Sequence, residues 1–462
     1  MKKISIATAV FTGSFAALSM ATASAQPALI AKGTLTSSRA GSYADLSGLK
    51  GTLENGAAAN LLGGFGSGIA HVSGDQFLAV PDRGPNAIPF NSNIDDTASY
   101  INRFHTIKMN LKPSSGSALP YTIEPELEAT TLLFNLTPLV YGSGNGLGVG
   151  SGEPKQNNFL QHFFTGRSDN FDPDQNSGDP RDARLDPESI RVSNDGLSVF
   201  ISDEYGPYVY QFLRFDGLRV RTFQLPKKFF VSNLSPMGAV EIADNTSGRV
   251  ANKGMEGLAI TPDGRTLVGI MQNSLIQDAA FGGDAANLLR IVTIDILSGR
   301  THEYGYLLTT GSGVSDIVAL NNHELLVDER DGKGLGDGSK AKIKQIFKID
   351  LQGATDIGNM NGAEAATHTV AKSLFLDIVQ VLTANGFATT AIPAKIEGLA
   401  FGPDVKSGNA TLHTLWVAND NDFLQDFSGP NTNPNQFFVF GFKDSDLGGS
   451  TYVPQQRFGF LD

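Results

Sequence analysis

One short pattern recurs along this chain and constrains its fold more than any other feature. Each copy brings a carboxylate or a glycine to the start of an apolar segment, and a turn and a short β-like run follow. The copies begin at residues 186–190, 254–259 and 395–400, with a degenerate copy at 66–70. Repeated strand–turn–strand units of this size predict a propeller or a similar array. Because a propeller brings equivalent positions of every blade to one axis, its repeated acids would form a ring of negative charge that suits cations.

The spacing of the copies predicts the number of blades. Alignment on the apolar residue gives Ile69, Ile190, Leu258, Ile317 and Leu399, separated by 121, 68, 59 and 82 residues. The first interval has room for two units, so we expect about six blades, with seven as the alternative. Short apolar runs between Asn-Asp-Gly and Asp-Gly turn signals favour an all-β fold. We therefore predict one β-propeller domain over residues 26–462.

Three segments depart from the repeated unit. Residues 371–384 have a helical pattern and are predicted to be a side insertion between blades. Residues 145–182 form a long loop rich in Gly, Asn and Asp, and loops of this length are usually functional or disordered. The runs 29–35 and 437–442 are expected to pair within one blade and close the ring, which removes free sheet edges.

The N-terminus has the order of a secretory signal peptide. Two lysines precede an apolar stretch, and Ala-Ser-Ala ends at Ala25. We therefore predict a signal peptide over residues 1–25, a mature chain that begins at Gln26, and a periplasmic or secreted location. No other segment approaches the roughly 18 apolar residues of a membrane span. The chain has no cysteine, so the fold must be held by its core alone.

The net charge restricts the partners. It is −12 for the whole chain and −14 without Lys2 and Lys3, which argues against a nucleic acid or an anionic membrane as partner. A small anionic substrate could approach only if bound cations reversed the local field. We expect a monomer that takes such a substrate.

The carboxylates at the starts and ends of the β-like runs form the first candidate site. They are Glu188, Asp203, Glu204, Glu256, Asp328, Glu329, Glu397 and Asp420. Acids brought to one channel repel one another unless a cation or a proton intervenes. Hard oxygen ligands suit Ca²⁺ first and Mg²⁺ second. The alternative is that these acids accept backbone N–H groups in neighbouring turns.

Two arginines that each directly follow an acid form the second candidate site. Arg83 follows Asp82, Arg330 follows Glu329, and Lys344 lies further along the chain. The planar guanidinium fork suits carboxylate or phosphate oxygens, so both arginines could hold an anion beside the acidic ring. The alternative is a structural Arg–Asp pair between blades.

The other motifs give weaker indications of function. Residues 172–179 alternate Asp and Asn like the start of a calcium loop, but the glycine falls one place late and no glutamate ends the loop, so a solvated polar loop is the better interpretation. His71, His302 and His323 are scattered without metal-ligand spacing, which gives no indication of zinc. The sequence contains no Gly-x-Ser-x-Gly elbow, phosphate-binding loop or dinucleotide fingerprint.

Several spaced motifs together resemble the bacterial family described as having esterase-like activity of phytase. They occupy residues 81–84, 186–188, 202–207, 255–259, 328–330 and 396–400, and the resemblance extends over about residues 63–440. It implies an exported β-propeller related in outline to the calcium-dependent alkaline phytases, which use calcium ions in an acidic channel to bind phosphate and activate water. One departure is Gln272-Asn273, an amide pair at a strand end where other copies have acids.

These observations predict a metal-dependent phosphoester hydrolase. The predicted Ca²⁺ ligands are Glu188, Asp203, Glu204, Glu256, Asp328, Glu329 and Glu397. Arg83 and Arg330 would steady the anion, and Glu256 is the predicted catalytic carboxylate. Two alternatives stay open, a lactonase or carboxylic ester hydrolase and a non-catalytic scaffold propeller whose calcium is structural.

Overall fold

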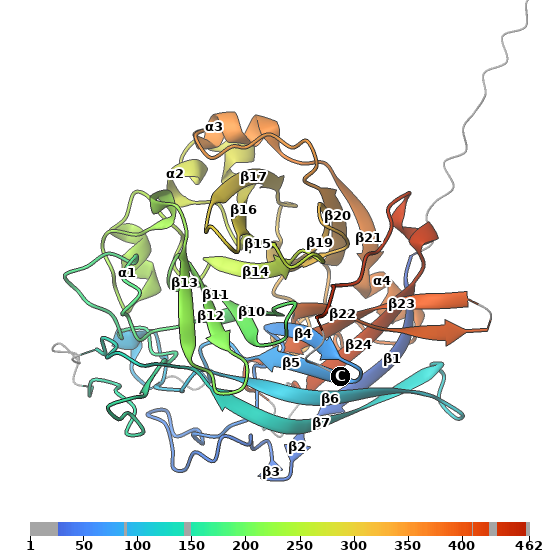
Figure 1. The fold of residues 1–462 in the computed structure, drawn as a ribbon, viewed down its shortest axis with the longest axis horizontal. Coiled ribbons are helices and arrows are strands. Elements are labelled where there is room, and N and C mark those ends of the chain that lie inside the picture. The colour runs from blue at the N-terminus through green and yellow to red at the C-terminus, as the bar shows by residue number, and fades with distance from the viewer. Residues whose placement is uncertain (1–25, 87–89, 143–148, 409, 425–431, 459–462) are drawn as a thin grey trace, which may run out of the picture.

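The described part of the chain folds into five four-stranded antiparallel sheets arranged as the blades of a propeller (Figure 1). A computed structural model gives the positions of residues 26–86, 90–142, 149–408, 410–424 and 432–458. The innermost strand of each blade packs against the innermost strands of its two neighbours, in the order β4, β10, β14, β18, β22 and back to β4. The ring is therefore closed at the axis by five strands.

The blades follow one another along the chain. Blade 1 contains β4 (Gly68–Ser73), β5 (Gln76–Val80), β6 (Arg103–Pro113) and β7 (Tyr121–Leu132). Blade 2 contains β10 (Pro187–Val192), β11 (Ser198–Asp203), β12 (Tyr208–Leu213) and β13 (Arg219–Gln224). Blade 3 contains β14 (Met255–Ile260), β15 (Thr266–Met271), β16 (Leu288–Asp295) and β17 (Thr301–Leu307). Blade 4 contains β18 (Gly313–Ala319), β19 (Glu324–Arg330), β20 (Lys344–Asp350) and β21 (Lys372–Asp377).

Blade 5 combines the two ends of the described chain. It contains β22 (Lys395–Ser407), β23 (Ala410–Asp420), β24 (Asn435–Phe442) and, as its outer strand, β1 (Ala28–Leu35). Ala28 lies opposite Gly441 and Leu35 opposite Asn435. This pairing confirms the predicted closure of the ring by the first and last β-like runs.

Shorter elements decorate the ring. Two small hairpins are β2 (Ser37–Ser38) with β3 (Gly41–Ser42), and β8 (Phe134–Asn135) with β9 (His162–Phe163). The α-helices are α1 (Gly238–Ala243), α2 (Ile276–Ala279), α3 (Gly362–Ala365) and α4 (Ile378–Ala384). The 3₁₀ turns are η1 (Ser92–Ile94), η2 (Lys227–Phe229), η3 (Gly283–Asn287), η4 (Ala366–His368) and η5 (Asp444–Leu447). Within the described ranges, no helix is both long and apolar enough to span a bilayer.

The prediction of about six blades is wrong, because the structure has five. The five aligned apolar residues all lie on inner strands, one per blade, so the repeat itself gave the correct number. The long first interval does not hold a further blade. In its described residues it contains the long strands β6 and β7, of 11 and 12 residues, and the β8–β9 hairpin, with no further four-stranded sheet before β10.

The predicted helix over 371–384 is correct only in its second half. Residues 372–377 form β21, the outer strand of blade 4, where Gln345 pairs with Asp377 and Ile349 with Lys372. Helix α4 begins only after Asp377, whose side chain accepts a hydrogen bond from the backbone N–H of Gln380 at 2.9 Å. This N-cap fixes the point where the strand ends and the helix begins. The predicted loop 145–182 is irregular where described, apart from β9, and residues 145–148 lie outside the described residues.

Apolar side chains fill the space between adjacent blades, and this packing forms the core. One cluster joins blades 1 and 5, where the ring of Trp416 on β23 packs on Phe77 of β5 with centroids 4.6 Å apart. Another joins blade 5 to blade 4 through Phe438, Phe440 and Leu326. Each blade is thus held by both neighbours, as expected for a fold without disulfides.

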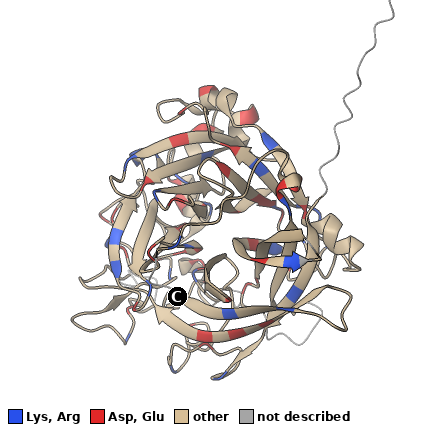
Figure 2. Cartoon of the chain, turned by 45° about the vertical axis from the view of Figure 1, so that its right-hand side comes forward, with Lys and Arg blue, Asp and Glu red and all other residues tan. Residues whose placement is uncertain are grey.

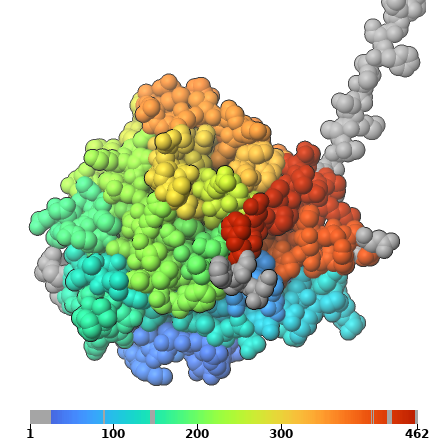
Figure 3. Space-filling view, in the orientation of Figure 1, coloured from blue at the N-terminus to red at the C-terminus, as the bar shows by residue number. Residues whose placement is uncertain are grey.

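The C-terminal residues 452–458 form a strap across one end of the ring, the end where the inner strands finish. In Figure 3 the last described residues, in red, lie over the middle of the face in view. Backbone N–H groups of the strap donate to carbonyls that follow the inner strands: Val453 to Leu320, Gln456 to Pro262 and Phe458 to Asn194. A cavity of about 480 Å³ lies between the strap and the inner strands. The strap therefore covers the end of the axis opposite to the candidate site described next.

Candidate functional site

Three glutamates lie at matching places near the beginnings of inner strands. They are Glu188 on β10, Glu256 on β14 and Glu397 on β22. At each of them the pairing of the inner strand with the next strand shifts register: between Pro187 and Ile190, Met255 and Gly257, and Ile396 and Leu399. Such β-bulges redirect side chains and are common beside active sites. The repeat therefore carries both the acid and the backbone irregularity that turns it towards the axis.

These glutamates open into one polar cavity of about 240 Å³, which we call the acidic cavity. Figure 2 shows that acidic positions occur on the inner parts of the blades as well as on their outer strands. The carboxylates that line the acidic cavity are Asp82, Asp186, Glu188, Glu204, Glu256, Glu397 and Asp420. The other side chains that line it are Arg83, Asn86, Asn252, Lys253, Gln272, Arg330 and Lys395. The predicted convergence of Glu188, Glu204, Glu256 and Glu397 is therefore present in the structure.

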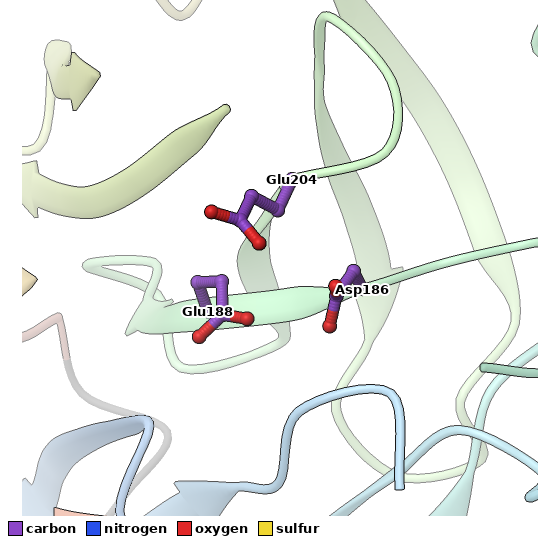
Figure 4. Close-up of side chains that lie close together, drawn as sticks. All are labelled: Asp186, Glu188 and Glu204. Carbon is purple, nitrogen blue, oxygen red and sulfur yellow. The ribbon is translucent and has the colours of Figure 1, made fainter. Parts of the chain in front are cut away.

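A tight group of carboxylates contains Asp186, Glu188 and Glu204 (Figure 4), all at the end of the β10–β11 pair where β10 begins and β11 ends. One oxygen atom of each lies within 4.8 Å of the others. The backbone holds this geometry, because the N–H of Glu204 donates to the carbonyl of Asp186 at 2.9 Å. Three carboxylate oxygens at such distances could share one hard divalent cation.

Several carboxylate oxygens in the acidic cavity have no protein partner. Oε1 of Glu204, Oε2 of Glu256 and Oε2 of Glu397 are buried, and none accepts a hydrogen bond from a described residue. These three residues are only 2, 3 and 3% exposed. An unpaired buried carboxylate is costly, so such atoms indicate a missing ligand or a proton. The donor set is all oxygen, which fits Ca²⁺ and does not fit zinc.

The protonation behaviour of the acidic cavity agrees with this interpretation. Burial, followed by the charge of Asp186, raises the pKa of Glu204 to about 7. Burial and then the charge of a neighbouring glutamate raise the pKa of Glu188 and of Glu256 well above the ordinary value. Without a cation the cavity therefore retains protons at neutral pH. A divalent cation would replace those protons and restore the charged carboxylates.

Both predicted arginines reach the acidic cavity and both are paired. The backbone N–H and Nη1 of Arg83 donate to the two oxygens of Asp186, at 2.9 and 3.1 Å. Arg330 of blade 4 forms an ion pair with Glu397 of blade 5. The Nε atoms of both arginines are nevertheless buried without a hydrogen-bond acceptor among the described residues. Each arginine thus bridges two parts of the ring and keeps one N–H group for a further acceptor.

Three predicted residues lie behind the acidic cavity and do not line it. Oδ1 of Asp203 accepts from the backbone N–H groups of Asp186 and Tyr205, at 3.1 and 3.0 Å, so Asp203 shapes the cavity wall. Burial raises the pKa of Asp203 to about 7. Lys344 donates to Oδ1 of Asp331 at 2.6 Å. Asp328 is fully buried, neither of its oxygens has a hydrogen-bond partner among the described residues, and burial raises its pKa well above the ordinary value.

Glu329 is fully occupied by neighbouring groups away from the acidic cavity. It accepts hydrogen bonds from the hydroxyl of Tyr306, the ammonium of Lys372, Ser312 Oγ at 2.9 Å and the backbone N–H of Thr309 at 3.2 Å. These contacts tie the outer strand β21 and the β17–β18 connection to β19. The geometry at this position corresponds to the structural alternative, an acid that satisfies neighbouring donors.

The sequence interpretation did not assign Asp186, Asp82 or Lys395 to the metal site or to anion binding. Asp186 begins the recurring pattern two residues before Glu188, and that spacing was the signal that could have identified it. Lys395 forms ion pairs with Asp420 at 2.7 Å and with Asp422. Burial and the charge of Asp420 raise the pKa of Asp82 well above its ordinary value. Blade 5 thus adds a second group of acids, balanced by one lysine.

The remaining motifs lie elsewhere. In the loop 172–179, side-chain oxygens of Asp172 and Asn176 accept from backbone N–H groups two residues on, at 3.0 and 2.8 Å, as in ordinary polar turns. His302 and His323 contact Asp356 and Asp350 separately, at 2.7 and 2.8 Å.

Fold and cavity together define a five-bladed propeller with an acidic site on its axis. The chain belongs to the phytase-like family described as having esterase-like activity of phytase, whose model matches residues 60–423. The match includes the inner strands of all five blades and every carboxylate of the acidic cavity.

Comparison with individual proteins adds the following. A protein of Arthroderma benhamiae described as an uncharacterized secreted protein is 29% identical over 283 residues, which cover 54% of this chain and 52% of that one. This chain thus spans about half the length of that relative. Among solved structures, a PQQ-bound aldose sugar dehydrogenase from Streptomyces coelicolor has a TM-score of 0.32 and 11% identity, with 87% and 84% of the two chains covered. The periplasmic gluconolactonase of Pseudomonas aeruginosa has a TM-score of 0.30 and 12% identity, with 84% and 86% covered.

Proposed function

We propose that the protein is a calcium-dependent hydrolase of small anionic phosphoesters. The observation that carries this proposal is the set of buried carboxylate oxygens without protein partners on Glu204, Glu256 and Glu397, beside the unpaired Nε groups of Arg83 and Arg330. Glu204 and Glu256 can form a side-chain hydrogen bond only by sharing a proton, and a cation could replace that proton. The arrangement thus offers acceptors for a cation beside donors for an anion.

Asp186, Glu188 and Glu204 are the residues that would hold the cation, because their oxygens already converge. When bound, Ca²⁺ supplies a Lewis acid for a phosphoryl oxygen and lowers the pKa of water. Glu256 lines the same cavity from blade 3, within reach of this group, and one of its carboxylate oxygens accepts no hydrogen bond from a described residue. We assign it the role of general base.

Arg83 and Arg330 would orient the anionic group. Each is held by a carboxylate from a neighbouring part of the ring, so its guanidinium plane is fixed before the substrate arrives. A preorganised donor loses little conformational entropy on binding. The same ion pairs also favour a second candidate, a scaffold propeller with structural calcium, in which the arginines only join blades.

A hydrolysis assay separates these functions. Purified protein is incubated with p-nitrophenyl phosphate, bis-p-nitrophenyl phosphate and δ-gluconolactone, each in 1 mM Ca²⁺ and in excess chelator. The proposal requires phosphoester turnover that is lost with chelator and restored by Ca²⁺. Turnover of the lactone without turnover of either phosphoester would refute the phosphoester hydrolase and support the lactonase alternative. If Ca²⁺ raises the melting temperature but no substrate is hydrolysed, the hydrolase proposal is refuted and the scaffold propeller with structural calcium is supported.

We also propose that the protein is exported. Residues 1–25, the predicted signal peptide, lie outside the described residues, and the first described strand begins only at Ala28. A relative described as secreted supports this assignment.

A further inference from the structure

A buried ion pair lies on the propeller axis below the acidic cavity, and none of the functions proposed above uses it. Nη2 of Arg191 on β10 donates to both carboxylate oxygens of Asp316 on β18, at 2.9 and 2.8 Å. The two side chains are 7 and 0% exposed. Burying such a pair is expensive unless further hydrogen bonds satisfy both groups.

Those further hydrogen bonds reach all five inner strands. Nη1 of Arg191 donates to the carbonyl of Ile69 on β4 at 2.7 Å. Asp316 accepts from Ser189 Oγ on β10 at 2.9 Å, from the N–H of Leu399 on β22 at 2.9 Å and from the N–H of Leu258 on β14 at 3.4 Å. One ion pair therefore connects every blade at the axis.

The sequence position of Asp316 is unusual within the repeat. The residue before the aligned apolar position is Gly68, Ser189, Gly257, Asp316 or Gly398 in the five blades. Small residues are required here because the strands nearly touch: a Cβ atom on Gly257 would lie 2.9 Å from Cα of Asp316, and one on Gly68 2.7 Å from Cα of Ser189. Asp316 is the one charged member of this set, and the hydroxyl of Ser189 is one of the groups that bond to it across the axis.

The groups of other blades that donate to Asp316, one hydroxyl and two backbone N–H groups, lie next to glutamates of the acidic cavity. Ser189 directly follows Glu188, and the N–H groups of Leu258 and Leu399 lie two residues after Glu256 and Glu397. In each case the β-bulge lies at this point, where ladder hydrogen bonds are interrupted. A bulged backbone is free to shift unless another group holds it.

We propose that Asp316 is a positioning residue that holds Glu188, a ligand of the proposed cation, together with Glu256 and Glu397 of the same cavity, in the geometry that binds the cation. This inference rests on the cation site of the proposed function and extends it to a residue that touches neither cation nor substrate. Outer groups that orient metal ligands typically change metal affinity 10- to 100-fold when they are replaced.

The test compares Asp316→Asn with a matched control in the full mature chain. The amide keeps the shape but replaces one acceptor by an N–H₂ group, which then faces the guanidinium of Arg191 together with either the N–H of Leu399 or the hydroxyl of Ser189. The control is Asp45→Asn, which alters a second buried Arg–Asp pair, with Arg103 on β6, where both side chains are 0% exposed and neither lines the acidic cavity. Calcium affinity is measured by isothermal titration calorimetry, and stability by urea denaturation.

We expect Asp316→Asn to raise the calcium Kd at least tenfold and Asp45→Asn to change it less than twofold, although both variants lose stability. The proposal would be overturned if the calcium Kd of Asp316→Asn were within twofold of the wild-type value. It would also be overturned if both variants lost calcium affinity equally. If Asp316→Asn does not fold, Ser189→Ala, which removes a single hydrogen bond to Asp316, is measured instead. Its Kd should rise about threefold, and an unchanged Kd would count against the proposal.

Failure of the proposed function is recognised separately. Calcium binding without phosphoester turnover refutes the hydrolase and leaves the positioning role intact. If the wild type binds no calcium, crystal structures of wild type and Asp316→Asn decide the matter. Displaced carboxylates of Glu256 and Glu397 would support the positioning role, and superimposable ones would reject it.

Discussion

The pH dependence of stability offers a direct test of the acidic cavity through Glu204. Burial and the charge of Asp186 raise the pKa of this residue from 4.5 to about 7 in the folded protein. Between these values the unfolded chain releases the proton of Glu204 while the folded chain retains it. Because this release favours unfolding, the contribution of Glu204 to the free energy of unfolding of the metal-free protein falls as the pH rises from 4.5 to 7. The pKa difference of Glu204 corresponds to a fall of about 3 kcal/mol in that contribution.

Other groups titrate in the same range, so the measurement must isolate Glu204. Burial lowers the pKa of His105 to about 4, and this group makes the protein more stable as the pH rises. We therefore compare wild type with Glu204→Gln, in which His105 is unchanged. In excess chelator, the free energy of unfolding of the wild type minus that of the variant should fall by about 3 kcal/mol between pH 4.5 and 7.5.

The assay is urea denaturation followed by circular dichroism at five pH values, with and without calcium. Millimolar Ca²⁺ should abolish the fall, because a cation bound only to the folded state stabilises the charged carboxylates. A difference that stays constant within about 1 kcal/mol, or that increases with pH, would refute the claim that Glu204 is held protonated in an empty cavity.

Further measurements address single residues. Glu256→Gln should reduce phosphoester turnover at least a hundredfold at an unchanged melting temperature in chelator, and normal turnover would remove Glu256 from the reaction. Glu329→Gln should lower the free energy of unfolding by about 1–3 kcal/mol and leave turnover unchanged, because Tyr306 and Lys372 occupy this carboxylate. Millimolar Ca²⁺ should raise the melting temperature of the wild type above its value in chelator, and equal values would argue against a metal site. Mass spectrometry of exported protein should find Gln26 as the first residue, and a longer N-terminus would contradict the predicted cleavage.

The sequence predicted the architecture correctly wherever one repeat corresponds to one blade. Ile69, Ile190, Leu258, Ile317 and Leu399 all lie on inner strands, because a buried strand at the axis needs an apolar residue after a small one. The blade number was wrong because a long interval between copies was equated with a further unit. Residues 103–132 lengthen two strands of blade 1 instead, which no local pattern distinguishes from a new blade.

The site was predictable to the extent that it depends on strand register. Glu188, Glu256 and Glu397 occupy one repeated position, so their convergence followed from the repeat. The contacts of Glu329 could not be predicted, because its partners Tyr306, Ser312 and Lys372 lie outside β19 in two other regions of the chain. Asp316 was missed for a related reason, since a glycine-like position in the pattern gave no sign that its side chain crosses the axis.

The composition of blade 5 has a consequence for the order in which the molecule can assemble. Asn435 donates to the carbonyl of Leu35 across 400 residues of chain, whereas the strands of blades 2 and 3 are each contiguous in sequence. Blades 2 and 3 can therefore form from local segments, but β1 has no sheet to join until β24 exists. Contacts of such long range slow folding and leave strand edges open in the meantime. During synthesis the ring therefore stays open until β24 has emerged, so blades 1 to 4 must persist without the closing contacts of blade 5.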